Sequence, residues 1–264
     1  MNKLMMGLVV CCAYKAFGFD GETVVAIQTP FQPGARTARV LVPTHAALSR
    51  RVIYLLPVEA AGEHRFGDGM DEAEKFDLAN KYGAAFVEPD FAQLPWYADN
   101  PANKDIQQES YLLKSVLPQV EAGLGWAEGT DRYLVGFSKS GWGALVLLIR
   151  HPDMFRGAAA WDAPLMKRHP DAYGMGDIIG SEENFRNYDF FRLISANPGA
   201  LENHTVVLLG YQAFRADMQG AHDLLTRTGV VHVFEDGPDR PHNWTSGWVL
   251  EAVERVLSSR RTAR

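Results

Sequence analysis

The feature that most constrains this chain is an octapeptide, Gly136–Gly143, between two apolar runs. The four residues before it read Arg-Tyr-Leu-Val and are typical of a buried strand, whereas the apolar run after it predicts a buried helix. A serine on a sharp strand-to-helix turn needs small residues two positions before and after it, because the tight backbone leaves no room there for side chains. Gly136 and Ser140 meet this requirement around Ser138.

The octapeptide therefore follows a G-x-S-x-S pattern, a small-residue variant of the G-x-S-x-G turn that exposes a nucleophilic serine. Ser138 is the predicted nucleophile, because Ser140 would have the bulky Trp142 at one flanking position. The alternative is a helix cap or an anion-binding loop. The spacing of a Walker A loop and the G-x-G-x-x-G dinucleotide fingerprint are both absent from the sequence.

The N-terminus has the layout of a secretory signal peptide. It has a positive charge at Lys3 near its start, followed by an apolar run that is too short to span a membrane. The sequence Ala16-Phe17-Gly18 then suits a cleavage site. We expect residues 1–18 to be a signal peptide and 19–264 to form a single domain, which implies a secreted or periplasmic protein. The alternative is an N-terminal arm of the folded protein.

Composition narrows the possible partners and cofactors. The formal net charge is −6 and no basic run occurs, which argues against a nucleic-acid partner. Both cysteines, Cys11 and Cys12, lie in the predicted leader, so the mature chain would carry neither a disulfide nor a catalytic thiol. H-E-x-x-H is absent and the histidines show no ligand spacing, so we expect no metal and no other cofactor.

Short apolar runs alternate with helical segments along the chain. This order predicts an α/β fold with a mostly parallel central sheet flanked by helices. Residues 164–200 interrupt the rhythm, and we interpret them as an insertion or lid, or alternatively as a surface excursion with its own small packed cluster. The expected strands are 22–28, 36–42, 52–56, 84–88, 132–135, 157–161, 204–209 and 230–234, and the expected helices are 71–82, 105–124, 144–149, 218–227 and 244–257.

His242 is the predicted general base for the serine. A serine hydroxyl needs a base within hydrogen-bond reach to become a nucleophile. Of the eight histidines, His242 lies in a loop after the last predicted strand and just before the last predicted helix, which is where the order Ser, acid, His requires it.

The acid that would orient His242 has several candidates. Asp217 is the only carboxylate in the loop after the strand at 204–209, so we predict that it fills this role. Capping of the next helix is an equally suitable task for it. Asp162, directly after the strand at 157–161, is the next candidate, and the remaining ones are Glu235, Asp236 and Asp239.

An oxyanion hole needs two backbone N–H donors. One is expected from Lys139, the residue after the serine. The other is expected from the loop after the strand at 52–56, where Pro57 has no N–H to offer. Val58 and Glu59 are the candidates in that loop, and Glu59 is favoured.

The chain resembles the putative-esterase branch of the α/β-hydrolase superfamily, which contains esterase D-like and feruloyl-esterase-like proteins. The similarity spans most of residues 36–258 and rests on four short stretches, at 54–56, 136–143, 151–155 and 241–244. The chain departs from the family pattern in two ways. Ser140 replaces a glycine, and the loop after the strand at 52–56 lacks the His-Gly pair that many relatives carry there.

The resemblance implies the α/β-hydrolase fold and serine carboxylic-ester hydrolysis. Two other functions remain open, an acyltransferase with the same triad and a non-catalytic binding protein on a hydrolase scaffold. The expected partner is a small-molecule or carbohydrate ester, and the oligomeric state is not indicated. Aromatic side chains near the expected loops would line the substrate cleft or, equally, belong to the core, and the candidates are Trp96, Trp161, Tyr211 and Trp244.

Cleavage of the predicted signal peptide would give the exported protein a specific N-terminus. Mass spectrometry of protein secreted by its native host should find an N-terminus near Phe19, because signal peptidase cleaves after a small residue. A mature protein that still begins at Met1 or Asn2 would contradict this prediction.

Overall fold

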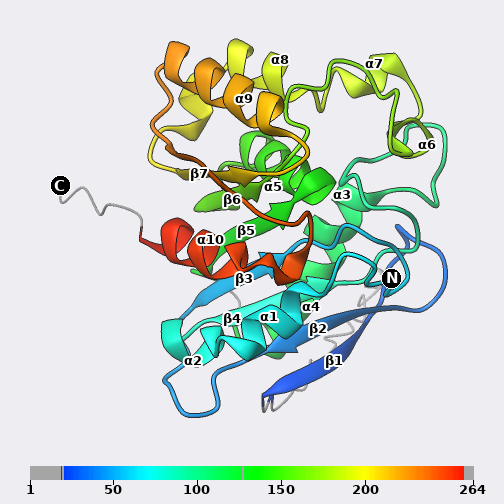
Figure 1. Ribbon diagram of the computed structural model, residues 1–264. Helices are drawn as coiled ribbons and strands as arrows, with labels where there is room; N and C mark the ends of the chain where they lie inside the picture. The colour runs from blue at the N-terminus through cyan, green and yellow to red at the C-terminus, as the bar shows by residue number, and fades with distance from the viewer. Residues whose placement is uncertain (1–18, 20, 127, 259–264) are drawn as a thin grey trace, which may run out of the picture.

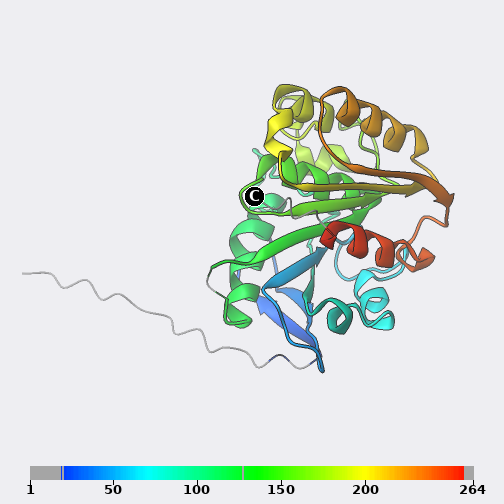
Figure 2. The ribbon, with the colours of Figure 1, turned by 90° about the vertical axis from the view of Figure 1, so that its left-hand side faces the viewer.

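The computed structural model describes residue 19, residues 21–126 and residues 128–258. The predicted signal peptide and both cysteines lie outside the described residues. An eight-stranded sheet crosses the molecule and separates two layers of helices (Figure 1; Figure 2). Its strands are β1 (Glu22–Ile27), β2 (Arg36–Leu41), β3 (Arg51–Leu55), β4 (Ala85–Pro89), β5 (Asp131–Phe137), β6 (Gly157–Trp161), β7 (Thr205–Tyr211) and β8 (Val233–Asp239).

The strand order is β1-β2-β4-β3-β5-β6-β7-β8. The pairings β1–β2 and β2–β4 are antiparallel, and all the others are parallel. Parallel neighbours need crossover connections, and helices supply them on both faces. The carboxyl ends of the parallel strands consequently meet at one edge of the sheet, where ligands bind in folds of this kind.

One helical layer contains α1 and α2, which cross between β3 and β4, together with α10 at the C-terminal end. The opposite layer contains α4, α5 and α9. Each layer buries its own apolar cluster against the sheet. The helices, with short helical turns marked η, are α1 (Gly69–Lys75), α2 (Leu78–Tyr82), α3 (Gln108–Tyr111), η1 (Leu112–Val116), α4 (Leu117–Gly123), α5 (Ser138–Arg150), α6 (Met175–Ile179), α7 (Glu182–Phe185), α8 (Phe190–Ala196), η2 (Pro198–Leu201), α9 (Arg215–Arg227), η3 (Trp244–Ser246) and α10 (Trp248–Leu257).

The fold class predicted from the alternating pattern is confirmed, and most strand positions agree within a few residues. The helix expected over 71–82 is two helices, because Asp77 adopts a left-handed φ of 51° between them. The last strand begins at Val233 and not at Val230, which lies in the loop after α9. The apolar pattern identified these elements but not their ends, since backbone geometry at turns is set by neighbouring segments.

Residues 164–200 form the expected insertion between β6 and β7. It holds α6, α7, α8 and η2, and it covers one end of the sheet above α5 (Figure 1). Its aromatic residues Phe185, Tyr188 and Phe190 are buried and join the apolar cluster around α5. The insertion therefore packs as part of the domain. Within the described residues, no helix is both long and apolar enough to cross a membrane.

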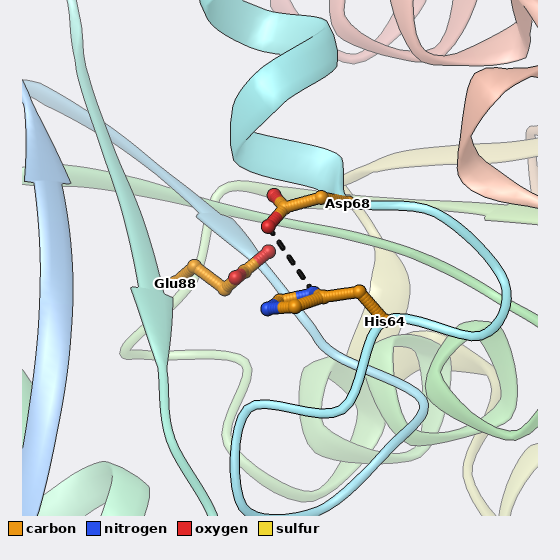
Figure 3. Close-up of side chains that lie close together, drawn as sticks. All are labelled: His64, Asp68 and Glu88. Carbon is orange, nitrogen blue, oxygen red and sulfur yellow. Dashed lines mark ion pairs between the residues drawn. The ribbon is translucent and has the colours of Figure 1, made fainter.

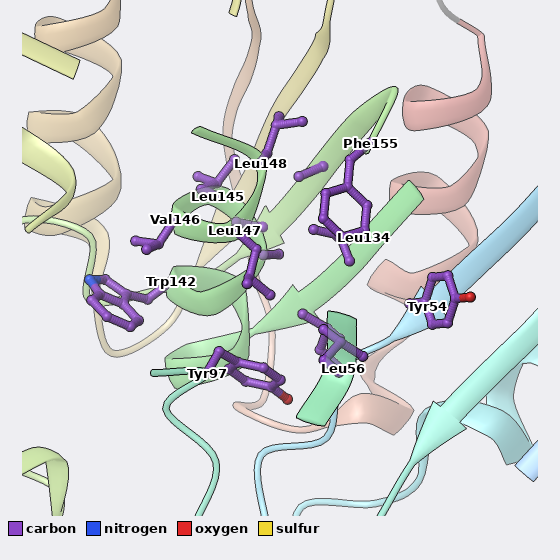
Figure 4. Packing of buried hydrophobic residues seen from close by; sticks show 14 of the residues in the cluster. Tyr54, Leu56, Tyr97, Leu134, Trp142, Leu145, Val146, Leu147, Leu148 and Phe155 are labelled. Atoms are coloured by element: carbon purple, nitrogen blue, oxygen red, sulfur yellow. The ribbon is translucent and has the colours of Figure 1, made fainter. Parts of the chain in front are cut away.

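Tyr97 packs into the core between α5 and the loop that follows β3 (Figure 4). Its backbone is left-handed, with φ at 54°, and its N–H donates to Gln108 Oε1 at 2.9 Å. The ring lies so close to α5 that a Cβ at Gly143 would stand 2.2 Å from Tyr97 Cδ2. Glycine at 143 is therefore required by packing and not by backbone conformation.

The close approach predicts that Gly143→Ala destabilises the protein. Overpacking of a tight core costs about 1–3 kcal/mol of unfolding free energy, which lowers the melting temperature by roughly 2–4 °C per kcal/mol in a domain of this size. Thermal unfolding followed by circular dichroism measures the effect. Gly199→Ala is the matched control, because its added Cβ finds its nearest neighbour at 3.7 Å. Equal melting temperatures for the two variants would contradict the packing argument.

Candidate active site

Ser138 lies at the sharp turn between β5 and α5, at the carboxyl edge of the sheet. Its φ is 52°, in the left-handed region that serines rarely adopt. Its side chain is half-buried, and it starts a thirteen-residue helix whose first N–H groups have no intrahelical acceptor. A Cβ at Gly136 would stand 2.5 Å from the carbonyl oxygen of Ser140. The small residue expected before the serine is thus required by the turn itself.

Ser140 is fully buried and is engaged with the backbone of the turn. Its hydroxyl donates to the Phe137 carbonyl at 2.9 Å and accepts from the Phe137 N–H at 3.1 Å. It therefore closes the turn from inside and has no free surface for a substrate. The glycine that occupies this position in the common pattern could not form these two hydrogen bonds, because it has no side chain.

The next strand over places Asp162 beside Ser138. Phe137 and Trp161 are register partners on the parallel strands β5 and β6, so the residues that follow them leave the sheet side by side. Asp162 also has a left-handed φ, at 42°, and is fully buried. Its Oδ2 accepts a hydrogen bond from His242 Nδ1 at 2.6 Å.

Asp162 is held as an ionised carboxylate by several donors. Its Oδ1 accepts from the Phe214 N–H at 2.7 Å, and its Oδ2 accepts from the Ala213 N–H at 2.9 Å. Burial raises the pKa of this carboxyl, but the hydrogen bonds from His242 and from the backbone after β7 outweigh burial and lower the pKa. An ionised Asp162 requires His242 to carry its proton on Nδ1, which leaves Nε2 as an acceptor.

His242 reaches this position from the loop between β8 and η3. Its ring lies 5.0 Å, centroid to centroid, from the ring of Phe137, which directly precedes Ser138. Within the described ranges no hydrogen bond joins the Ser138 hydroxyl to His242. Such bonds in serine hydrolases are often long before a substrate is bound. The structure therefore brings the three residues together at one edge of the sheet. Ser138 follows β5, Asp162 follows β6, and His242 lies in the loop between β8 and η3.

Asp217, the acid first expected to pair with His242, lies elsewhere. It stands in the first turn of α9, and its Oδ1 accepts from the Met166 N–H at 2.9 Å. Its side chain thus holds the start of the 164–200 insertion against α9. Burial raises the pKa of this carboxyl, so it is less suited to stay ionised than Asp162. Sequence order alone did not separate the two, because both follow parallel strands that end at the same edge.

The loop after β3 lies on the other side of the serine. Within the described residues, the N–H groups of Val58 and Glu59 donate to no protein acceptor. Lys139 stands in the first turn of α5, where its N–H is also free of an intrahelical acceptor. The donors expected from the sequence are therefore available. Tyr97 supports this loop, because its buried hydroxyl donates to the Pro57 carbonyl.

The Glu59 side chain fastens the segment that follows it. It accepts from Arg65 Nε at 2.5 Å and from the Phe66 N–H at 3.1 Å. Phe66 in turn touches His242, with ring centroids 5.9 Å apart. The Lys139 side chain lies in the same neighbourhood, where burial lowers its pKa to about 8 against the opposing effect of the Glu59 charge. Arg65, a second cation, lowers it further.

The aromatic side chains proposed to contact substrate are mostly in the core. Trp96, Trp161 and Trp244 are at most 2% exposed, so they have no surface to present to a cleft. Trp161 stacks on Trp248 with nearly parallel rings, and Trp96 packs edge-on against Trp142 of α5. Tyr211 is half-buried, with the Arg215 guanidinium over its ring. The sequence identified these residues as aromatic, but it did not indicate which face of the fold each side chain occupies. That face determines whether the side chain is buried.

A different set of rings surrounds His242. Phe66, Phe137, Trp161 and Phe214 all lie with centroids within 6.0 Å of the imidazole. Phe66 and Phe214 are half-buried and reach the surface. Phe66 was not predicted from the sequence, because its loop has no pattern that marks it. These rings cover most of the imidazole and leave the His242 side chain 20% exposed.

Comparisons with known proteins agree with this architecture. Residues 89–209 match the model of a family described as Putative esterase. This segment is similar to that family. The resemblance predicted from the short motifs is thereby confirmed for the part of the chain from β4 to β7. A search of curated proteins finds no match.

Solved esterase and hydrolase structures share the fold. A ferulic acid esterase superposes with a TM-score of 0.67 at 18% identity, over 89% of this chain and 96% of that one. A fluorophosphonate-binding serine hydrolase from Staphylococcus aureus gives 0.70 at 18% identity, over 89% and 98%. An S-formylglutathione hydrolase from Agrobacterium tumefaciens gives 0.64 at 18%, over 89% and 95%. At this identity the likeness establishes the α/β-hydrolase fold, and activity needs a separate argument.

The pairing of Asp162 with His242 predicts unequal effects of two conservative substitutions. Asp162→Asn should lower kcat for ester hydrolysis by a factor on the order of 10⁴, because an amide selects the wrong tautomer of the histidine. Asp217→Asn should stay near wild type, since its Oδ1 can still accept from the Met166 N–H. Steady-state kinetics measures both, with circular dichroism as the check on folding. A large loss in Asp217→Asn beside an active Asp162→Asn would contradict this assignment.

The lowered pKa of Lys139 predicts a pH-dependent effect on stability. Near pH 7 the folded protein carries a half-buried ammonium at a cost, so Lys139→Met should be more stable than the wild type. As the pH rises through about 8, the folded amine loses its proton, while an unfolded lysine keeps it up to about 10.5. The advantage of Lys139→Met should therefore shrink by about pH 9.5. Urea unfolding measures it, the exposed Lys104→Met is the control, and a constant advantage would contradict the argument.

Proposed function

We propose that this protein is a serine carboxylic-ester hydrolase in which Ser138, His242 and Asp162 form the catalytic triad. The observation that carries the proposal is the 2.6 Å hydrogen bond from His242 Nδ1 to a buried Asp162, next to a serine in a left-handed turn. The match of residues 89–209 to the esterase family supports the class of reaction. Asp162 replaces Asp217 in this proposal because only Asp162 pairs with the histidine.

The chemistry follows from the roles of these groups. His242 Nε2 takes the hydroxyl proton as Ser138 Oγ attacks the ester carbonyl, and Asp162 stabilises the imidazolium that forms. The N–H groups of Lys139 and Glu59 would bind the resulting oxyanion. Return of the proton from His242 to the alkoxide releases the alcohol and leaves an acyl group on Ser138. A water molecule then repeats the sequence and frees the acid.

The substrate proposed is a small-molecule or carbohydrate ester. The aromatic rings of Phe66 and Phe214 are placed to contact it, because they are half-buried and touch His242. Removal of the predicted leader would place this activity in the periplasm or outside the cell. The acidic net charge of the chain gives no reason to expect a polyanionic substrate.

Covalent labelling tests the nucleophile directly. A fluorophosphonate should add one adduct to the wild type, and peptide mass spectrometry should place it on Ser138, because only an activated serine reacts. Ser138→Ala should lose both the label and the hydrolysis of aryl and alkyl esters. Ser140→Ala serves as the comparison, since Ser140 faces the interior of the turn. Labelling that persists in Ser138→Ala, or that maps to Ser140, would overturn the proposal.

A further inference from the structure

Three side chains of metal-binding type converge near the end of β4, apart from the serine site (Figure 3). His64 belongs to the loop that follows Glu59, Asp68 directly precedes α1, and Glu88 lies in β4. One ligand atom from each residue lies within 4.8 Å of the others. Both carboxylates and the imidazole are turned toward a common point.

The distances suit a small divalent ion with little movement. His64 Nδ1 and Asp68 Oδ2 are 3.1 Å apart. Two ligands bound tetrahedrally to zinc at about 2.0–2.1 Å stand roughly 3.4 Å from each other. This pair is therefore already close to coordination spacing, and the Glu88 carboxylate needs to approach by roughly 1.5 Å at most.

Arg39 divides its ion pairs among four carboxylates and lies farthest from Glu88. Arg39 pairs with Glu22 at 2.5 Å, with Asp71 at 2.9 Å and with Asp68 at 2.5 Å, but it stands 3.8 Å from Glu88. Glu88 is only 7% exposed, and its distance to Arg39 is the longest of these four ion pairs. Arg39 would keep Glu22 and Asp71 as partners if Asp68 turned to the ion.

A cavity of about 220 Å³ gives access to this cluster. His64 and Glu88 line it directly, as does Arg39, and three further carboxylates on its wall form ion pairs with Arg65 or Arg36. These carboxylates are Glu59, Glu63 and Asp90.

We propose that His64, Asp68 and Glu88 bind one zinc ion, with water at the fourth position. One imidazole and two carboxylates favour zinc over calcium or magnesium, which prefer oxygen ligands throughout. The sequence predicted no metal, because His64 and Glu88 are far apart in the chain and become neighbours only when β4 joins the sheet. The ion would tie the segment that carries Glu59 and Phe66 to α1 and β4, and so stabilise one wall of the serine site.

Titration of Zn²⁺ into chelator-treated protein tests the site without any reference to esterase activity. All variants are made on a Ser138→Ala background, so a failed hydrolase assignment leaves the test intact. Isothermal titration calorimetry should give one ion per chain, and the bound ion should raise the melting temperature, because it binds only the folded protein. His64→Ala and Glu88→Gln should each weaken binding by more than about tenfold. Glu88→Gln preserves side-chain shape and guards against misfolding.

Two controls separate this site from other histidines. His45→Ala removes an exposed histidine 3.7 Å from Asp77, and His222→Ala removes one that pairs with His232 at 2.8 Å. Both should bind Zn²⁺ as the wild type does. Arg39→Met should tighten binding, because it removes the cation that competes for Asp68. Absence of binding, or an affinity unchanged in His64→Ala and Glu88→Gln, would overturn the proposal.

Discussion

The hydrogen bond between His242 Nδ1 and Asp162 Oδ2 is the interaction on which the site depends. It joins the loop before η3 to the end of β6, and two backbone N–H groups after β7 donate to the same carboxylate. Three segments that are distant in sequence are thereby fixed to one another. The buried charge is tolerated because each of its oxygen atoms has donors, and the same donors keep the carboxylate ionised. That ionised state determines which nitrogen of His242 is free to accept a proton.

Parallel strand register explains why the serine and the acid are neighbours. Adjacent parallel strands lie about 4.8 Å apart, and β5 and β6 end in register at Phe137 and Trp161. Ser138 and Asp162 each leave the sheet in a left-handed conformation, which turns their side chains out of the strand direction. Such conformations cost about 1–3 kcal/mol each, and they persist where packing determines them. Here the tight packing of the turn leaves no room for a side chain at Gly136, because a Cβ there would stand 2.5 Å from the Ser140 carbonyl oxygen.

The opposite wall of the site is built by the loop after β3. The buried Tyr97 hydroxyl donates to the Pro57 carbonyl, and the buried Glu59 carboxylate accepts from Arg65 and from the Phe66 N–H. Among the residues that the structure describes, the backbone N–H groups of Val58 and Glu59 have no protein acceptor. Free donors on a loop that is fixed at both ends are preorganised for a developing negative charge. The proposed metal cluster lies further along the same loop, so its ion would add a third anchor.

Local sequence signals determined the elements of this protein and two members of its site. Apolar runs of strand and helix length specified the α/β pattern, and the small residues around Ser138 specified the turn, because both depend on neighbours within a few positions. His242 was identified by its place before the last helix. The choice of Asp162 over Asp217 depended on tertiary structure, since it required the register of β6 against β5 and the path of the loop after β7. Burial of Trp96, Trp161 and Trp244, and the meeting of His64 with Glu88, were decided in the same way, because long-range packing chooses which face of each element is covered.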